Sequence, residues 1–187
     1  MMTRRAVWSF LIGVAGCANE SSSQERAADR QEVEESDAST ESRGCVSQVT
    51  STLPLKSARY DPDKGGLVDS LQTEYVVAAT RAVVKPERDE DFMSLGLNVV
   101  AQVASQSGMI AYATGEGSCG DRFTLSIWEN EEAMYAFVTS GAHASAMAQS
   151  AELVHEGSTT HWTASEAEVN ALSWDDAQQH LEPPHGR

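Results

Sequence analysis

The sequence predicts an α+β domain in which an antiparallel sheet carries two helices on one of its faces. Residues 123–128 alternate between apolar and polar side chains and lead directly into a helical pattern, which is typical of a strand followed by a helix. Residues 73–84 are rich in β-branched side chains on both faces, which predicts a central strand. A glycine-containing turn at residues 116–121 separates two strand-like runs and predicts a hairpin. Along the chain, these elements give the order β-α-β-β-α-β of a ferredoxin-like fold.

The first helix is expected directly after the strand at residues 73–84. Pro86 suits the first turn of a helix, and the acidic residues within 87–91 suit the positive end of the helix dipole. A broad apolar stripe follows within residues 92–103 and is suited to lying on a sheet. Gly108 is expected to end this helix.

The hairpin is expected to join strands at residues 109–114 and 123–128. One face of the second strand is apolar and comprises Phe123, Leu125 and Ile127. We expect the helices to pack on that face. The other face comprises Thr124, Ser126 and Trp128. A large aromatic side chain beside small polar ones indicates a cleft or a docking surface on this second face.

The second helix is expected to begin after Asn130, which suits the N-cap position. The pair Ser140–Gly141 predicts a break or kink, with the helix continuing over residues 143–151. A fourth strand is predicted at residues 158–163. Near the end of the chain, Ser173 and Asp176 have the spacing of a capping box, which predicts a short final helix.

The N-terminus reads as an export signal. A basic head is followed by a short apolar run, and residues 1–16 end in Val-Ala-Gly before Cys17, which resembles a bacterial lipobox. The alternative is a buried apolar helix with an incidental cysteine. The lipobox predicts that Cys17 is lipidated and becomes the new N-terminus, so that the protein is anchored in a lipid bilayer. We therefore expect a bacterial cell-envelope protein at the outer membrane or cell surface.

The segments between this anchor and the sheet are polar. Residues 17–44 are acidic, rich in serine and almost free of apolar side chains, which predicts a disordered tether. A weak helix at residues 24–35 is the alternative. Residues 45–72 contain several proline and glycine turns and are expected to wrap the domain as an irregular arm. The domain itself is expected at residues 73–182, with a short tail at 183–187.

Charge and cysteine spacing exclude several classes of function. The formal net charge of −15 argues against a nucleic-acid partner, because affinity for phosphates comes from lysine and arginine. The mean hydropathy of −0.36 is that of a soluble body. The three cysteines lack the close spacing of a metal or redox motif, so no metal site is expected.

The two cysteines behind the lipobox are expected to pair. After lipidation of Cys17, only Cys45 and Cys119 remain, and export would place them in an oxidising compartment. We expect a Cys45–Cys119 disulfide that ties the arm to the hairpin. Two unpaired thiols, or a bond between two molecules, are the alternatives.

The run Leu125-Ser-Ile-Trp128-Glu-Asn-Glu-Glu-Ala-Met134 and the segment 140–147 resemble the dimeric α+β barrel superfamily. Within it they are similar to the antibiotic biosynthesis monooxygenase-like group, which includes haem-degrading enzymes. Trp162 and residues 172–177 resemble the tail of an uncharacterised branch of this group. The resemblance covers roughly residues 73–180. Because fold does not confer activity, it indicates the fold more firmly than the function.

The resemblance implies a homodimer whose two sheets face each other, with a hydrophobic cleft between sheet and helices in each subunit. Family enzymes oxidise polycyclic or haem substrates, often without a metal or flavin of their own. The haem-degrading members use a tryptophan on the third strand, a histidine on the second helix and an asparagine on the first strand. Trp128 matches the first of these and His143 matches the second loosely. The strand at 75–84 contains no asparagine, which departs from the haem-degrading pattern.

Five residues are candidates for contact with a ligand. Trp128 suits a cleft wall, although a core or dimer-interface position explains it equally well. His143 suits an axial ligand or an acid–base group, and a histidine that satisfies the helix break is the alternative. Arg81 and Tyr112 suit recognition of an acidic group, or else an ion pair and a packed tyrosine. His161 lies in the predicted fourth strand and points either to a ligand or to solvent.

Two functions are compatible with these residues. The first is a lipid-anchored protein whose domain binds a small hydrophobic or aromatic ligand, or a partner, without turnover. The second is a monooxygenase-like enzyme that acts on such a ligand, either without a cofactor or with haem. The enzyme requires Trp128 and His143 around one cavity, whereas a binding module can fill that space with its own side chains.

Overall fold

The computed structural model describes residues 47–52, 55, 57–70 and 72–181. The chain divides into two units, Met1–Gly44 and Cys45–Arg187, and all of the described residues belong to the second. The predicted signal peptide, Cys17, Cys45 and the tether lie outside the described residues. Among the residues that are described, no helix is long and apolar enough to cross a membrane.

The sheet has five antiparallel strands, four of which are the predicted ones. They are β4 (Glu74–Val84), β5 (Met109–Gly117), β6 (Arg122–Trp128) and β7 (Val154–Ser165). The fifth, β1 (Val49–Thr52), comes from the predicted arm and pairs with β5. The strand order is β1-β5-β6-β4-β7, so β4 is an interior strand as predicted. Without β1, this is the ferredoxin-like arrangement that the sequence predicts.

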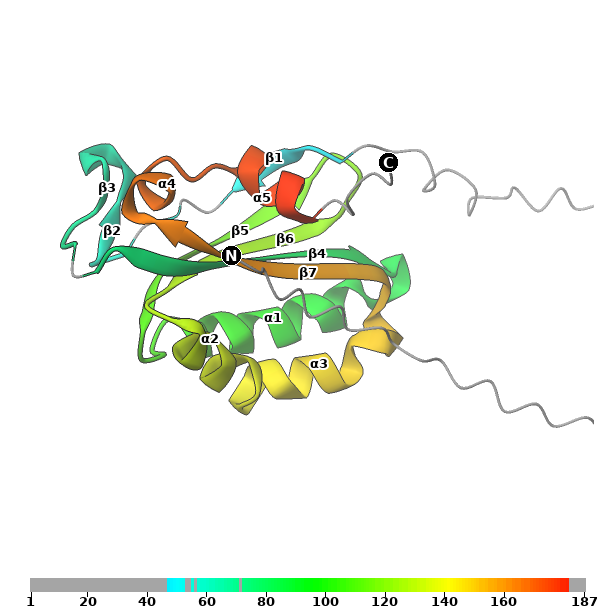
Figure 1. The fold of residues 1–187 in the computed structure, drawn as a ribbon. Coiled ribbons are helices and arrows are strands. Elements are labelled where there is room, and N and C mark those ends of the chain that lie inside the picture. The colour runs from blue at the N-terminus through cyan, green and yellow to red at the C-terminus, as the bar shows by residue number, and fades with distance from the viewer. Residues whose placement is uncertain (1–46, 53–54, 56, 71, 182–187) are drawn as a thin grey trace, which may run out of the picture. The chain divides into compact units, whose positions relative to one another are not determined.

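Three helices cover one face of the sheet (Figure 1): α1 (Asp89–Val103), α2 (Glu131–Val138) and α3 (Gly141–Leu153). Pro86 begins a short 3-10 turn, η3 (Pro86–Arg88), that leads into α1. The predicted N-cap of α2 is confirmed, because the Asn130 side chain accepts a hydrogen bond from the Ala133 amide at 2.9 Å. The predicted break is confirmed too: Ser140 is the N-cap of α3, and Gly141 has a φ of 55°.

Some element boundaries differ from the prediction. Strand β7 spans 12 residues instead of the six predicted, because it pairs with β4 along nearly the whole length of that strand. Helix α1 ends at Val103, ahead of the predicted stop at Gly108. The predicted capping box is confirmed at the N-terminus of α5 (Trp174–Leu181), where Ser173 and Asp176 hydrogen-bond each other's backbone amides.

The opposite face of the sheet is covered as well (Figure 1). The arm supplies β1, the short ribbon β2 (Tyr60–Asp61) and β3 (Gly66–Leu67), and the turn η2 (Pro62–Lys64) between them. The C-terminal segment supplies α4 (Glu166–Asn170) and α5. A hydrophobic core lies beneath these elements. Its buried members on the central strands are Tyr75, Val77, Ala79, Leu125 and Ile127.

The predicted assignment of the two sheet faces is wrong. Leu125 and Ile127, which we expected under the helices, pack beneath the arm and the C-terminal segment. The helices pack on the face of Ser126 and Trp128. There a second core cluster contains Trp128, Val76, Val103, Met134 and Phe137. The sheet is therefore buried on both sides, and the more apolar face of β6 is not the face that receives the helices.

Candidate functional site

A row of four threonines crosses the sheet on the side of the helices. In the strand register, Thr114 of β5 lies opposite Thr124 of β6, Thr124 opposite Thr80 of β4, and Thr80 opposite Thr159 of β7. We call these four residues the threonine row. Because side chains one strand position apart alternate between faces, all four share the face that carries Trp128. The row therefore gives the helix side of the sheet a polar band next to its apolar cluster.

Helix α1 passes over the threonine row. At its first residue, Asp89 pairs with Arg122 at one end of β6, with 3.0 Å between Oδ1 and Nη2. At its last residue, Val103 packs in the cluster with Trp128 at the other end of β6. A helix of 15 residues and a strand of seven both span about 20 Å. The middle of α1 must therefore lie above Thr124.

Solvent nevertheless reaches the threonine row. Thr124 is exposed although it lies on a central strand, and Thr159 is exposed too. Gly96 lies on the same stripe of α1 as Val99 and Val103, and a Cβ atom placed on Gly96 would meet nothing within 4 Å. The helix layer thus buries the Trp128 end of the sheet, whereas Thr124 and Thr159 stay exposed; we call the solvent-accessible space above the threonine row the opening.

Further polar groups flank this opening. Tyr112 lies opposite Ser126 in the register, in the row next to the threonines and on the same face. Burial raises the pKa of the Tyr112 phenol, which keeps it protonated and able to donate. Within the part of the chain that the structure describes, no group hydrogen-bonds the hydroxyls of Tyr112, Thr114 or Thr124. These hydroxyls are available to a ligand.

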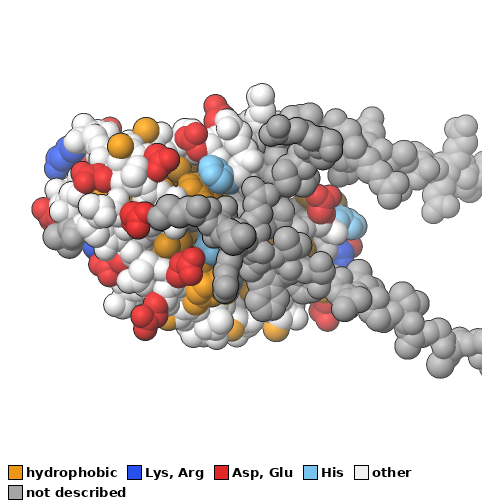
Figure 2. Space-filling view, viewed as in Figure 1, with side chains coloured by type: hydrophobic (Ala, Val, Ile, Leu, Met, Phe, Trp, Pro, Cys, Tyr) orange, Lys and Arg blue, Asp and Glu red, His pale blue; other side chains and the backbone are white. Residues whose placement is uncertain are grey.

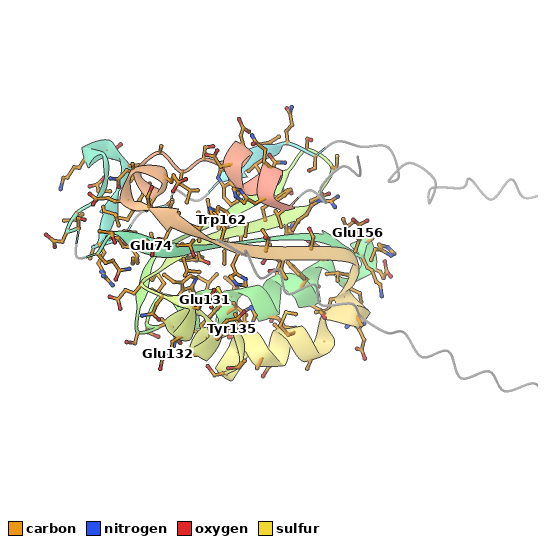
Figure 3. The ribbon with its side chains drawn as sticks, viewed as in Figure 1. Glu74, Glu131, Glu132, Tyr135, Glu156 and Trp162 are labelled. Carbon is orange, nitrogen blue, oxygen red and sulfur yellow. The ribbon has the colours of Figure 1, made fainter. Side chains whose placement is uncertain are left out.

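The β7 edge forms one rim of the opening. His161 lies on the helix side of β7, with its ring edge-on to Tyr135 of α2 at 5.8 Å between centroids. Its Nε2 atom lies 3.7 Å from the Glu131 carboxylate. Figure 3 shows Glu131 and Tyr135 projecting from α2 towards the sheet, and Figure 2 shows hydrophobic and histidine side chains gathered on this side of the molecule. His161 is thus a rim residue and is not turned away from the helices.

Trp128 and His143 do not line one cavity. Trp128 is only 1% exposed, and its Nε1 donates to Ser126 Oγ at 2.9 Å. The Phe137 ring lies between the two, with its centroid 5.2 Å from Trp128 and 4.7 Å from His143. The expectation that Trp128 faces away from the helices beside a cleft is therefore wrong, because α2 packs Phe137 directly on the indole.

His143 takes part in the junction between α2 and α3. Its Nδ1 lies 3.0 Å from the Val138 carbonyl oxygen, and its backbone amide donates to Gln102 Oε1 of α1. Gln102 in turn donates to the Ser140 carbonyl. Burial lowers the pKa of the His143 imidazole, so the neutral form is favoured. These contacts show that His143 stabilises the break between α2 and α3.

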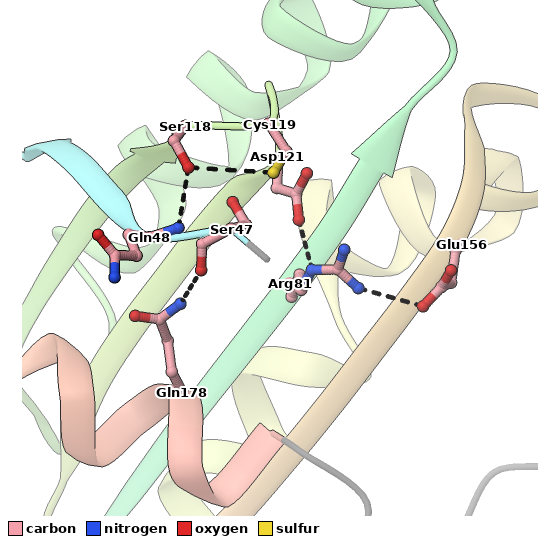
Figure 4. A network of polar contacts seen from close by, with 8 residues as sticks. All are labelled: Ser47, Gln48, Arg81, Ser118, Cys119, Asp121, Glu156 and Gln178. Atoms are coloured by element: carbon pink, nitrogen blue, oxygen red, sulfur yellow. Dashed lines mark hydrogen bonds and ion pairs between the residues drawn. The ribbon is translucent and has the colours of Figure 1, made fainter. Parts of the chain in front are cut away.

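Arg81 lies on the other side of the sheet, away from the opening. Its guanidinium pairs with the buried carboxylate of Asp121 and, at 3.1 Å, with Glu156 (Figure 4). Asp121 belongs to the hairpin turn that also carries Cys119. Arg81 therefore holds the hairpin to the β7 edge, and it is not brought together with Tyr112, His161 or His143.

The residues around the opening do not fit haem. The propionates of haem are anionic, whereas residues 92–115 and 133–151, which span most of the helix layer and β5, contain no lysine or arginine. Arg122 is already paired with Asp89 and Glu116. His143, the expected axial ligand, uses one ring nitrogen at Val138 and packs against Phe137. Among the described residues, no group of three or more His, Cys, Asp or Glu side chains is placed to hold a metal ion.

Sequence reasoning missed the threonine row. Each of these threonines occupies a polar position in a predicted strand or at its edge, but a single strand gives no sign that four of them align. The signal was the recurrence of threonine in all four predicted strands.

Comparison with known proteins gives one family match. Residues 75–149 match the family model described as antibiotic biosynthesis monooxygenase. A search among curated proteins found no match.

Several solved structures are similar to part of the chain. Rv0793 from Mycobacterium tuberculosis is 17% identical, with a TM-score of 0.45, over 47% of this chain and 92% of its own. Protein SO0527 from Shewanella oneidensis is 12% identical, with a TM-score of 0.47, over 50% of this chain and 94% of its own. A putative monooxygenase from Lactobacillus acidophilus is 16% identical, with a TM-score of 0.44, over 51% of this chain and 49% of its own. We draw no functional conclusion from these weak likenesses.

The family match covers β4, α1, the hairpin, α2 and most of α3, whereas β7, which forms one rim of the opening, lies outside the matched residues. The match of residues 75–149 to this family model agrees with the resemblance inferred from the sequence.

Proposed function

We propose that the domain binds a small hydrophobic or aromatic ligand over the threonine row, without chemical turnover. The observation that carries this proposal is the exposure of Thr124 on a central strand that a helix crosses. An ordinary two-layer packing would bury that position under apolar side chains. The open space beside Gly96 and the unpartnered hydroxyls of Thr114 and Thr124 support the same site.

The charge pattern favours an uncharged ligand. No lysine, arginine, aspartate or glutamate occurs in residues 92–115 or 133–151, although charged residues make up 22% of the chain. A ligand in this opening thus meets mainly hydroxyls and apolar side chains, and the ionisable groups Glu131 and His161 lie at the rim. A buried charge on the ligand would lack a counter-ion there, which is costly.

Binding without turnover is favoured by the position of Phe137. An oxidising site built from the family's tryptophan and histidine requires both around one cavity, and Phe137 fills the space between Trp128 and His143. The family match favours a second candidate, a monooxygenase-like activity on the same ligand. Oxygen uptake with the bound ligand, and the mass of the ligand recovered afterwards, separate the two candidates.

A matched pair of dyes tests the binding proposal. N-phenyl-1-naphthylamine is neutral and apolar, and 1-anilino-8-naphthalenesulfonate adds a sulfonate to the same ring system. We expect the neutral dye to bind with one site per chain and the anionic dye to bind at least tenfold more weakly, a difference of about 1.4 kcal/mol. Thr124→Trp should abolish binding of the neutral dye by filling the opening. Val68→Trp, at an exposed position in the arm, is the control. A neutral dye that does not bind, or that binds Thr124→Trp unchanged, would refute the proposal.

We also propose that the protein is anchored at the bacterial cell envelope through lipid on Cys17. The lipobox-like residues before Cys17 and the acidic, serine-rich segment 17–44 support this. Intact mass of the protein from its own membranes tests it. The expected N-terminus is an acylated Cys17, and an unmodified chain that begins at Met1 would refute the anchor.

A Cys45–Cys119 disulfide is proposed as well. It is supported by the pairing of the arm with the hairpin, since the Ser118 amide donates to the Gln48 carbonyl at 2.8 Å. The Gln48 amide donates in turn to Ser118 Oγ at 3.1 Å (Figure 4). The chain three residues before Gln48 is therefore close enough to reach the turn. Peptide mapping without reduction should give one cross-linked peptide, whereas two alkylated cysteines would exclude the bond.

A further inference from the structure

The apolar face of the sheet is covered by two segments that are far apart in the sequence. Residues 47–70 supply β1, β2 and β3, and residues 166–181 supply α4 and α5 (Figure 1). We call these two segments the cap. Buried side chains of the cap, Tyr60, Val169 and Ala177, share one core with the sheet. Leu67, Trp174 and Leu181 pack at its border. The cap thus completes a hydrophobic core that the sheet does not close alone.

The two segments of the cap are bonded to each other as well as to the sheet. The Tyr60 hydroxyl donates to the Val169 carbonyl at 3.0 Å, and the Leu67 amide donates to Asn170 Oδ1 at 2.8 Å. At the other end, Gln178 Nε2 donates to the Ser47 carbonyl at 2.7 Å (Figure 4). Each segment therefore holds the other in place over the sheet.

Two glycines allow the close approach within the cap and beneath it. Gly66 has a φ of 110°, and a Cβ atom there would lie 2.9 Å from the Asn170 Cα. A Cβ atom at Gly115 would lie 2.8 Å from Val49 Cγ1 and 3.2 Å from the Trp174 ring. Gly66 and Gly115 thus lie at close contacts between backbone and cap, and any larger residue at either position would push the cap away from the sheet.

We infer that the cap takes the place of a second subunit's sheet, so that the chain is a monomer with its own complete binding site. The resemblance implies a dimer whose sheets face each other, and that pairing requires the face of Leu125 and Ile127 to be uncovered. Here that face is already buried by the chain itself. Strand β1 also occupies the outer edge of β5, so the two edges of the described sheet are β1, which belongs to the cap, and β7. This inference does not depend on the nature of the ligand.

Molar mass measured by light scattering tests the inference on the full chain in detergent, with the detergent contribution subtracted. We expect the mass of one chain over a wide range of concentration. Gly66→Ala should loosen the cap, because the new methyl group meets Asn170, and should therefore promote self-association through the uncovered face. Gly65→Ala is the matched control, since Gly65 also has a positive φ of 94° but a Cβ atom there would meet nothing within 4 Å.

A second variant covers the case in which Gly66→Ala fails to fold. Asn170→Ala removes the hydrogen bond to Leu67 without adding any atom, and should increase hydrogen exchange of the amides of β3 and α4 while α1 to α3 stay protected. A wild-type chain with the mass of two would overturn the inference. So would an Asn170→Ala variant whose exchange is the same as that of the wild type throughout the cap.

Discussion

Replacement of Gly96 by alanine should stabilise the protein. Gly96 lies in the interior of α1, where glycine is less favourable than alanine by about 1 kcal/mol. Because a Cβ atom at this position meets nothing within 4 Å, the methyl group brings neither a clash nor much packing. The change in the free energy of unfolding should therefore equal the difference in helix propensity between glycine and alanine. For the folded unit Cys45–Arg187, a gain of about 1 kcal/mol raises Tm by about 3–4 °C.

Replacement of the same residue by leucine should separate stability from ligand binding. Leucine is nearly as good a helix former as alanine, so Gly96→Leu should also fold stably. Its larger side chain projects into the space above the threonine row and should weaken binding of N-phenyl-1-naphthylamine at least tenfold, or about 1.4 kcal/mol. Asn98→Leu adds the same side chain at an exposed position of α1 and should leave binding unchanged.

Thermal unfolding followed by circular dichroism and a fluorescence titration of the dye measure the two effects. A Gly96→Ala variant that is less stable than the wild type would show that the position is already packed. A Gly96→Leu variant that binds the dye as tightly as the wild type would show that the ligand lies elsewhere. Either result would refute the reasoning that connects Gly96 to the opening.

Three further predictions concern groups away from the opening. Asp121→Asn should cost about 2 kcal/mol in urea unfolding, because it removes the charge that pairs with Arg81 in a buried position; an unchanged midpoint would contradict this. Ser173→Ala should cost about 1 kcal/mol, since it deletes the N-cap that Asp176 reciprocates, and the far-ultraviolet signal of a short helix should weaken with it. Burial lowers the pKa of His143 below 6.5, so the unfolded chain binds the proton first as the pH falls. Stability should therefore decline below about pH 6.5, and His143→Gln should reduce that decline; equal acid sensitivity in the variant would argue against the assignment.

The order of strands and helices could be predicted because each element carries its own local pattern. The Asn130 cap, the Ser140–Gly141 break and the Ser173 capping box are all encoded within a few residues, and each is present in the structure. Strand β1 and the ribbon in the arm could not be predicted, because they are short and their stability comes from pairing with distant residues.

The faces of the sheet could not be assigned from one strand. Alternation in β6 shows that Phe123 and Leu125 share a face. Because this sheet is covered on both sides, alternation alone does not show which face packs against the helices and which packs against the cap. The helices pack on the face of Ser126 and Trp128, where a polar row is compatible with a ligand site. The more apolar face belongs to the cap, whose C-terminal part lies more than 40 residues further along the chain than Leu125.

The candidate site was predicted only in part. Tyr112 and His161 flank the opening, while Arg81 lies on the other face and His143 fastens the helix junction. Trp128 is a core residue because the Phe137 ring covers it. The separation of these two residues in the sequence shows that a strand is followed by a helix, but it does not show that their side chains are in contact. The threonine row depends on strand register, which single-strand patterns do not contain.

Methyl-resolved NMR during titration with N-phenyl-1-naphthylamine tests the central claim most directly. We expect the methyl resonances of Thr80, Thr114, Thr124 and Thr159 to shift together and saturate at one dye per chain, while those of Leu67 and Val169 in the cap stay in place. Shifts confined to the cap, with the four threonine methyls unchanged at saturation, would contradict it.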